Sequence, residues 1–245
     1  MPTDPLAALL ELPGVADGVA RARSSVDGLL GHRVVRRRSG DVSAESVLRG
    51  AWLAAWLAGD QTALDDVRSG AAADDPVIQG ALRAYGALGP LRDVWGRAPR
   101  QALARLHALA AADLTDRAQL GRPGPGAADR LNTLAAVLGA TSAPAVVVAG
   151  VVLGELLTLD AFPPASAVVG HAAARLTLMH RGLDPKALVV VEAGHRELAG
   201  EYAAALDAYR TRTAAAIGRW LVHFADAVAA GAVESTAICE ALLRG

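Results

Sequence analysis

The chain of 245 residues carries 24 lysine and arginine and 25 aspartate and glutamate side chains, so its net charge is −1, and 53% of its residues are hydrophobic. This balance excludes the strongly basic surface of a typical nucleic-acid-binding protein and any long polybasic segment for a membrane surface. The length is sufficient to bury a sizeable core. The one run of charge, Arg36 to Arg38, is typical of a solvated loop more than of an anion site.

The beginning of the sequence, MPTDPLAALLELPG, lacks the basic region and the long apolar core of a secretory signal. We therefore expect a cytoplasmic protein. The most apolar span, Pro144 to Leu159, is interrupted by Glu155 and is shorter than the ~18 to 20 residues that a bilayer crossing needs. It predicts a helix buried among other helices, and no membrane partner is expected.

Alanine and leucine dominate, and no alternation of period two is sustained, which predicts an all-α fold. Caps such as Asp75 before Pro76 support the assignment of helices. Helices are expected over 14–31, 43–58, 60–70, 76–88, 99–111, 127–139, 144–158, 166–181, 196–209, 213–230 and 233–243. The runs HRVVRRR (32–38) and ALVVV (187–191) allow at most one short β-hairpin or flap. We expect a single domain over 1–245, with a helical extension over 1–72 and a core over 73–245.

The single cysteine and the histidines give no catalytic or metal-binding pattern. Cys239 excludes an internal disulfide, and its apolar surroundings predict a buried side chain. The six histidines are scattered and show no metal-ligand spacing, so no metal site is expected. His171 and His180 lie about 180° apart round one helix and are interpreted as packed or solvated side chains.

Two further motifs have a structural and a functional interpretation. Trp52 and Trp56, at i and i+4 on a predicted helix, would be able to grip a base, but core or interface packing is the commoner use of such a pair. The stretch 113–126 with GRPGPG is predicted to be an exposed loop. A phosphate-binding loop would need a preceding strand and a Lys-Ser or Lys-Thr pair, which Arg122 and the prolines do not supply.

The segment LDAFPPASAVVGH joins the most apolar predicted helix to an alanine-rich one. A compact turn followed by free amides at a helix start, here at Ser166 and Ala167, is suited to binding an anion. It is equally how any helix hairpin begins.

The turn and its flanking helices resemble the Fic and Doc (Fido) family, whose motif has the pattern HPFx[DE]GNGR. The positions of that motif are filled here by Asp160, Ala161, Phe162, Pro163, Pro164, Ala165, Ser166, Ala167 and Val168. The Gly182-Leu183 pair stands where the family's helix ends, the stretch 46–60 looks like its inhibitory helix, and EYAAALDAYR (201–210) resembles its C-terminal segment. The resemblance covers most of the chain, in pattern and spacing more than in catalytic residues. It implies an all-α, Fic-like helical bundle.

The resemblance also implies which functions the site has lost. The family's motif histidine, its metal-binding acid, its asparagine and its phosphate-binding arginine are replaced here by Asp160, Pro164, Ser166 and Val168. An unperturbed aspartate with a pKa near ~3.9 is a poor base at neutral pH. We therefore expect no catalytic residue, no metal and no cofactor, and ATP with magnesium enters only under the alternative that the chain is an active enzyme.

The segment that resembles the inhibitory helix lacks the glutamate that pairs with the motif arginine in the family. Its pattern positions are Ala54, Ala58 and Gly59. Losing one member of a buried ion pair typically costs ~3 to 5 kcal/mol, whereas replacing both with apolar residues can be neutral. Ala58 and Val168 are interpreted as that double replacement, and they are expected to lie close together.

The function expected from the sequence is that of a degenerate Fic-like protein, of the actinobacterial type, without transferase activity, that binds a protein or a small ligand. The alternatives are a Fic-type transferase of AMP or a related phosphate-containing group with non-standard residues, and an unrelated helical regulatory protein. A protein partner is expected, and homodimerisation is the plainer use of a hydrophobic fraction above the usual ~45 to 50%. No nucleic acid partner is expected.

Overall fold

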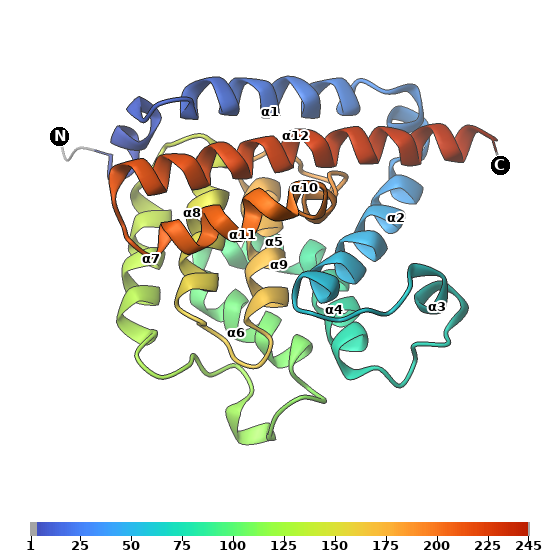
Figure 1. The fold of residues 1–245 in the computed structure, drawn as a ribbon. Coiled ribbons are helices and arrows are strands. Elements are labelled where there is room, and N and C mark those ends of the chain that lie inside the picture. Colours follow the sequence, from blue (N-terminus) through green and yellow to red (C-terminus); the bar gives the residue numbers. More distant parts are fainter. Residues whose placement is uncertain (1–3, 245) are drawn as a thin grey trace.

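The computed structural model of the protein describes residues 4–244. This part of the chain is 74% helical and forms no strand, which confirms the all-α fold (Figure 1). The elements in chain order are η1 (Ala7–Glu11), α1 (Val15–Leu30), α2 (Arg33–Leu57), α3 (Leu64–Ser69), α4 (Pro76–Gly86), α5 (Leu88–Arg97), α6 (Pro99–Ala110), η2 (Arg117–Gln119), α7 (Ala128–Ala140), α8 (Ala145–Thr158), α9 (Ser166–His180), α10 (Val191–Glu197), α11 (Ala199–Tyr209) and α12 (Ala214–Arg244).

Helices α8 and α9 form the centre of the bundle, and they are packed against each other along their length. Nearly every residue of both helices is buried, as their apolar and alanine-rich sequences predict. Small residues on α8 allow α12 to approach closely. A Cβ atom added to Gly154 would lie 2.8 Å from Trp220 Nε1, and that indole N–H donates to the carbonyl of Gly150 at 2.7 Å. The prediction of two adjacent buried helices joined by a short turn is confirmed.

The C-terminal helix α12 runs as one piece of 31 residues across one side of the molecule, with α1 beside it (Figure 1). Two helices with a break near residue 231 were expected, and this prediction is wrong. Gly231 does not end the helix. It allows α12 to lie close to the backbone before α10, because a Cβ atom at this position would be 2.5 Å from the carbonyl oxygen of Val190. By length and composition alone α12 is able to cross a membrane, but more than half of its most apolar stretch is buried inside the protein.

Neither of the short strands allowed for at 32–38 and 187–191 forms in the described chain. The first run begins α2, with the His32 ring accepting the Val34 amide at 3.3 Å and a non-helical residue at Arg38. Arg36 to Arg38 are exposed, as predicted, but Arg36 and Arg37 are helical and Arg38 lies at a kink within α2, so the run does not form a loop. In the second run, the carboxylate of Asp184 accepts the amides of Leu188 and Val189 at 2.9 and 2.8 Å. These amides are therefore unavailable for a strand ladder.

Other boundaries differ because glycine and proline conceal the helical pattern. The expected helix 76–88 ends at Gly86, and the sequence LGPLRDVWGR forms a separate helix, α5, that was not predicted. The expected helix 196–209 is divided into α10 and α11, with α10 beginning five residues earlier at Val191.

Candidate functional site

The turn between α8 and α9 is closed by its own backbone and by one hydroxyl group. Asp160 has a φ of 46°, in the left-handed region that aspartate tolerates, and its amide donates to the carbonyl of Leu157 at 3.2 Å. The amide of Phe162 donates to Ser166 Oγ at 2.9 Å, and the amide of Ala165 to the carbonyl of Phe162 at 2.9 Å. The Ser166 side chain therefore holds the turn, and α9 starts from a fixed backbone.

A pocket of about 320 Å³ lies at the first turn of α9. Its lining joins the end of α2, the start of α4, the end of α6 and the α8–α9 turn: Ala58, Gly59, Asp60, Val77, Ala110, Leu114, Pro164, Ala165 and Val168. We call it the α9 pocket. Ala58 and Val168 both line it, so the expected approach of the two residues is observed.

The side chains that line the α9 pocket are apolar except for one acidic group. Asp60 is the only charged residue among those that line it. Its carboxylate accepts the Thr62 amide at 2.7 Å, and Thr62 in turn donates its hydroxyl to Asp75 at 3.1 Å. The lining contains no arginine, lysine or histidine. Sequence reasoning missed Asp60, because nothing in the pattern 46–60 marks its final residue as part of a pocket.

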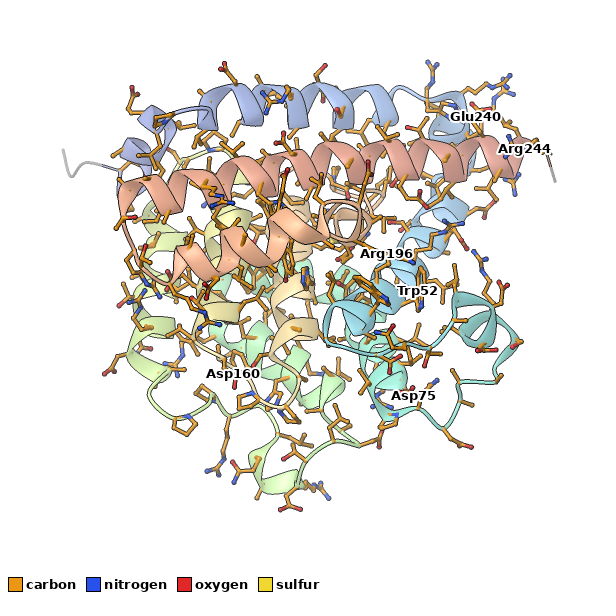
Figure 2. The ribbon with its side chains drawn as sticks, viewed as in Figure 1. Trp52, Asp75, Asp160, Arg196, Glu240 and Arg244 are labelled. Atoms are coloured by element: carbon orange, nitrogen blue, oxygen red, sulfur yellow. The ribbon has the colours of Figure 1, made fainter. Side chains whose placement is uncertain are left out.

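Of the four residues at the family's catalytic positions, Pro164 and Val168 line the α9 pocket, and Asp160 and Ser166 do not. Asp160, which stands where the resemblance places the base, is exposed in the turn before α9 and does not line the pocket (Figure 2). Phe162 is buried on the other side of the turn, and Ala167 is half-buried. Only Pro164, Ala165 and Val168 of the motif positions reach the pocket.

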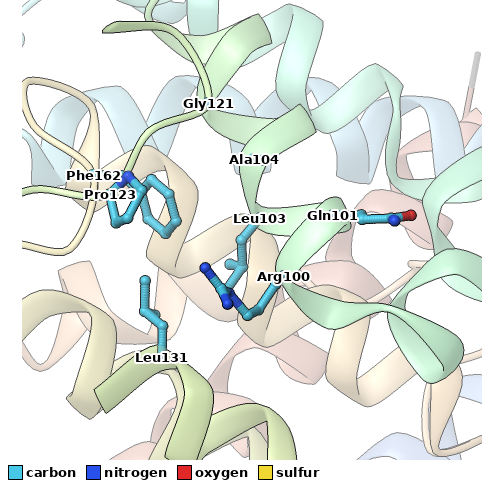
Figure 3. A pocket seen from close by; sticks show the side chains of 8 residues that line it. All are labelled: Arg100, Gln101, Leu103, Ala104, Gly121, Pro123, Leu131 and Phe162. Atoms are coloured by element: carbon cyan, nitrogen blue, oxygen red, sulfur yellow. The ribbon is translucent and has the colours of Figure 1, made fainter. Parts of the chain in front are cut away.

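A second cavity, of about 340 Å³, lies on the opposite side of the turn, where Phe162 forms part of its wall (Figure 3). The other lining residues come from α6, α7 and the loop after η2: Arg100, Gln101, Leu103, Ala104, Gly121, Pro123 and Leu131. We call it the Phe162 cavity. The loop GRPGPG, predicted to be exposed, contacts the turn through a 2.9 Å hydrogen bond from the Gly124 amide to the carbonyl of Ala161.

A buried arginine joins α9 to α2 and α10. Arg175 donates to the backbone carbonyl and the hydroxyl of Ser46 at 3.1 and 2.7 Å, and to the carbonyl of Ala187 at 2.8 Å. Its Nη1 atom lies 3.6 Å from the carboxylate of Glu192, which accepts the Tyr85 hydroxyl at 2.6 Å. Burial raises the pKa of Glu192, although Arg175 and Tyr85 act against the rise. Arg175 is buried and lines neither the α9 pocket nor the Phe162 cavity, so we interpret the network as structural.

Three histidines that the sequence shows as scattered meet in the core. His195 Nδ1 lies 3.0 Å from His223 Nε2, and His171 Nε2 lies 3.2 Å from the Tyr202 hydroxyl. Burial lowers the pKa of His171 to about 3 and that of His223 to about 4, and it lowers the pKa of His195 as well. In the described chain no group of three His, Cys, Asp or Glu side chains is placed to hold a metal ion. His180 is exposed, so it points away from His171 as expected.

The Trp52 and Trp56 pair lies beside Arg196 of α10 (Figure 2). The guanidinium carbon is 5.1 Å from the centroid of each indole ring, and Trp52 Nε1 donates to the carbonyl of Thr62 at 2.7 Å. The two rings are half-buried and already occupied by a cation of the chain itself. This arrangement agrees with the packing interpretation of the pair. Cys239 is fully buried, as expected.

No protein-family model matches the chain, and no curated protein matches it either. Among solved structures, the fold is similar to that of a Fic family protein from Desulfovibrio desulfuricans G20, with a TM-score of 0.72 and 18% sequence identity. The similarity covers 92% of this chain and 75% of that protein. With the helix order and the central α8–α9 pair described above, this similarity shows that the chain has a Fic-like helical fold.

Proposed function

We propose that this protein is a Fic-fold binding protein without transferase activity, and that it acts by binding a protein or a small uncharged ligand. The observation that carries the proposal is the lining of the α9 pocket. Val168 and Ala58 occupy the positions at which the resemblance implies an arginine and a glutamate. Asp60 is the one charged side chain among the lining residues.

Electrostatics argues against a nucleotide in this pocket. Phosphate groups are held in proteins by helix-start amides together with arginine or lysine, and the start of α9 offers only the amides. The carboxylate of Asp60 opposes a phosphate in the same volume. A nearby cation would be needed to reverse that balance, and the lining supplies none.

General-base chemistry also lacks a suitable group. Asp160 is exposed and outside the pocket lining. A carboxylate in water has little affinity for a proton at neutral pH, so it activates a hydroxyl poorly. Loss of a general base removes a factor of ~10² to 10⁴ in rate, and loss of the cation that stabilises the phosphate adds to that.

The test incubates the wild-type protein with radiolabelled ATP, GTP, CTP or UTP, magnesium and a cell extract as the source of acceptor proteins. We expect no labelled protein, and no binding of ATP by calorimetry. The triple variant Asp160→His, Pro164→Asp, Val168→Arg is expected to gain ATP binding. A matched triple with Val168→Leu in place of Val168→Arg keeps the other two changes and is expected not to bind.

The labelling assay separates the proposal from an active transferase. Labelling by the wild type that disappears in Asp160→Ala makes Asp160 a working base and overturns the proposal. Labelling that persists in Asp160→Ala overturns it too and places the activity elsewhere in the fold. Circular dichroism of every variant establishes that the helical fold is retained.

A further inference from the structure

The Phe162 cavity has the composition of a small-molecule site. It combines the apolar side chains of Leu103, Leu131 and Phe162 with one guanidinium group, that of Arg100. Ligand sites are concave and mostly apolar, with a few polar groups that orient the ligand. Figure 3 shows the guanidinium of Arg100 directed toward the space between Phe162 and Leu131, while Gln101 points away from it.

The guanidinium of Arg100 is held in position and still has donors to offer. Its Nη1 atom donates to Asn132 Oδ1 at 2.5 Å, and Arg100 pairs with no carboxylate in the part of the chain that the structure describes. A guanidinium has five N–H donors, and planar pairing with a carboxylate uses two of them. The hydrogen bond to Asn132 therefore orients the guanidinium and leaves enough N–H donors to bind an anion.

The walls of the cavity are fixed by contacts that do not depend on a ligand. The His107 ring lies against Phe162, with centroids 5.4 Å apart, and its Nδ1 atom accepts the amide of Gly121 at 3.1 Å. Burial lowers the pKa of His107, which favours the neutral ring that accepts this hydrogen bond. One side chain thus positions both the aromatic wall and the loop wall. A preformed site avoids the cost of ordering itself on binding.

We propose that the Phe162 cavity binds a small organic carboxylate with an apolar aromatic or aliphatic body, its carboxylate on Arg100 and its body against Phe162, Leu103 and Leu131. A cavity of ~150 Å³ holds a benzene molecule. The volume of about 340 Å³ therefore accommodates one ring together with a short chain. The proposal concerns the side of the turn opposite the α9 pocket, and it stands whether or not the chain transfers nucleotides.

The test uses three probes that share one apolar body: phenylbutyrate, phenylbutanol and phenylbutylamine. Each is titrated into the full-length protein, and binding is followed by amide chemical shifts in NMR spectra. For a ligand of this size we expect a dissociation constant on the order of 1 mM for phenylbutyrate. The alcohol is expected to bind about tenfold more weakly, because it loses the charge-assisted hydrogen bonds, and the amine more weakly still.

Variants assign the binding to the cavity. Arg100→Gln is expected to remove the preference for the acid over the alcohol, whereas Arg105→Gln, an exposed arginine of the same helix outside the cavity, leaves it unchanged. Ala104→Trp fills the cavity and is expected to abolish binding of all three probes. If Ala104→Trp does not fold, Arg100→Gln still tests the proposal, because the Arg100 side chain is exposed.

Four results would overturn the proposal. They are no binding of phenylbutyrate, equal affinity for the acid and the alcohol in the wild type, an equal effect of Arg100→Gln and Arg105→Gln, or binding that survives in a folded Ala104→Trp variant. Shifts that include Gly121 and Phe162 in the wild type and vanish in Ala104→Trp support it.

Discussion

Helix α2 contacts α9 in two regions of opposite chemistry. In the first, Arg175 is buried and donates hydrogen bonds to α2 and to a residue before α10, and it lies beside the carboxylate of Glu192. In the second, at the start of α9, Val168 shares a pocket with Ala58 at the end of α2, and most of the side chains that line it are apolar. The comparison shows that a cation is buried between α2 and α9 where several elements supply hydrogen-bond acceptors for it. Where no such acceptors are supplied, the same two helices contact each other through apolar residues.

The strongest test of this comparison is Arg175→Met. The change removes three hydrogen bonds and leaves the carboxylate of Glu192 buried beside the Tyr85 hydroxyl alone. Removing one member of a buried ion pair typically costs ~3 to 5 kcal/mol, and we expect that loss in the free energy of unfolding measured with urea.

The double variant Arg175→Met, Glu192→Leu serves as the control for the stranded carboxylate. It is expected to recover at least about half of the loss, because the carboxylate of Glu192 is then no longer buried without its cation. If the double variant is less stable than Arg175→Met, the carboxylate of Glu192 contributes independently of Arg175, and the two regions differ for another reason.

The reverse change, Val168→Arg, places a cation in the α9 pocket. We expect a loss of roughly 1 to 3 kcal/mol in the free energy of unfolding, because Val168 is buried and Asp60 alone is available as a counter-charge. Adding Ala58→Glu is expected to restore about 1 kcal/mol or more through coupling between neighbours, and Ala58→Gln less. Purely additive effects of the two substitutions would show that residues 58 and 168 do not pair.

The histidine cluster extends the comparison to buried ionisable groups that stay uncharged. His171, His195 and His223 remain neutral in the folded protein, where the pKa of His171 is about 3 and that of His223 about 4. The unfolded chain takes up protons below pH ~6.5. Proton uptake by the unfolded chain therefore destabilises the fold below that pH, and the free energy of unfolding falls until the pH reaches the folded-state pKa values.

We expect the free energy of unfolding to fall by about 1.4 kcal/mol per pH unit for each of these histidines between pH ~6 and ~4.5. His223→Gln should reduce the slope by about one such contribution, and His180→Gln, at an exposed histidine, should leave it unchanged. The carboxylates of Asp226 near His223 and of Glu192 are the same in all three proteins and cancel in the difference. Equal slopes in wild type and His223→Gln would contradict the neutral cluster.

The smallest effect on stability is expected at the surface, where Arg196 of α10 contacts two tryptophan rings of α2. Arg196→Ala removes the guanidinium from Trp52 and Trp56. Exposed cation–π contacts are worth ~0.5 to 1 kcal/mol, so the midpoint of thermal unfolding should fall by only a few degrees. Glu197→Ala, at the neighbouring exposed position, is the control. If Arg196→Ala lowers the free energy of unfolding as much as Arg175→Met does, the expected difference between buried and exposed cations is contradicted.

The sequence predicts the central part of the fold because its signals are local. The apolar run 144–159 and the alanine-rich run 166–181 are long enough to be helices, and the two prolines and Ser166 fix the turn between them. The expectation of a Fic-like arrangement of helices came from the resemblance. The division into α4 and α5, and the continuity of α12, were missed because glycine acts as a breaker in one place and as a site of close approach in the other.

The candidate site is less predictable, because its contacts join distant segments. No spacing in the sequence brings His171, His195 and His223 together, and a single arginine in an alanine-rich helix does not reveal the partners of Arg175. Asp60 becomes a pocket residue only when the end of α2 reaches the α8–α9 turn. The assignment of Ala58 and Val168 to one place came from the resemblance, since neither residue type carries a signal of its own.

The packing of α1 on α12 has a consequence for how the chain folds during synthesis. The apolar face of α1, formed by Ala22, Val26 and Leu29 among others, is covered mainly by a helix about 200 residues later in the chain. A ribosome adds about 5 to 20 residues per second, so α1 waits on the order of 10 s or more for its partner to be made. Contacts of such long sequence separation form late and slowly. Through that interval the nascent protein exposes an apolar helix face, which is the kind of surface that chaperones bind.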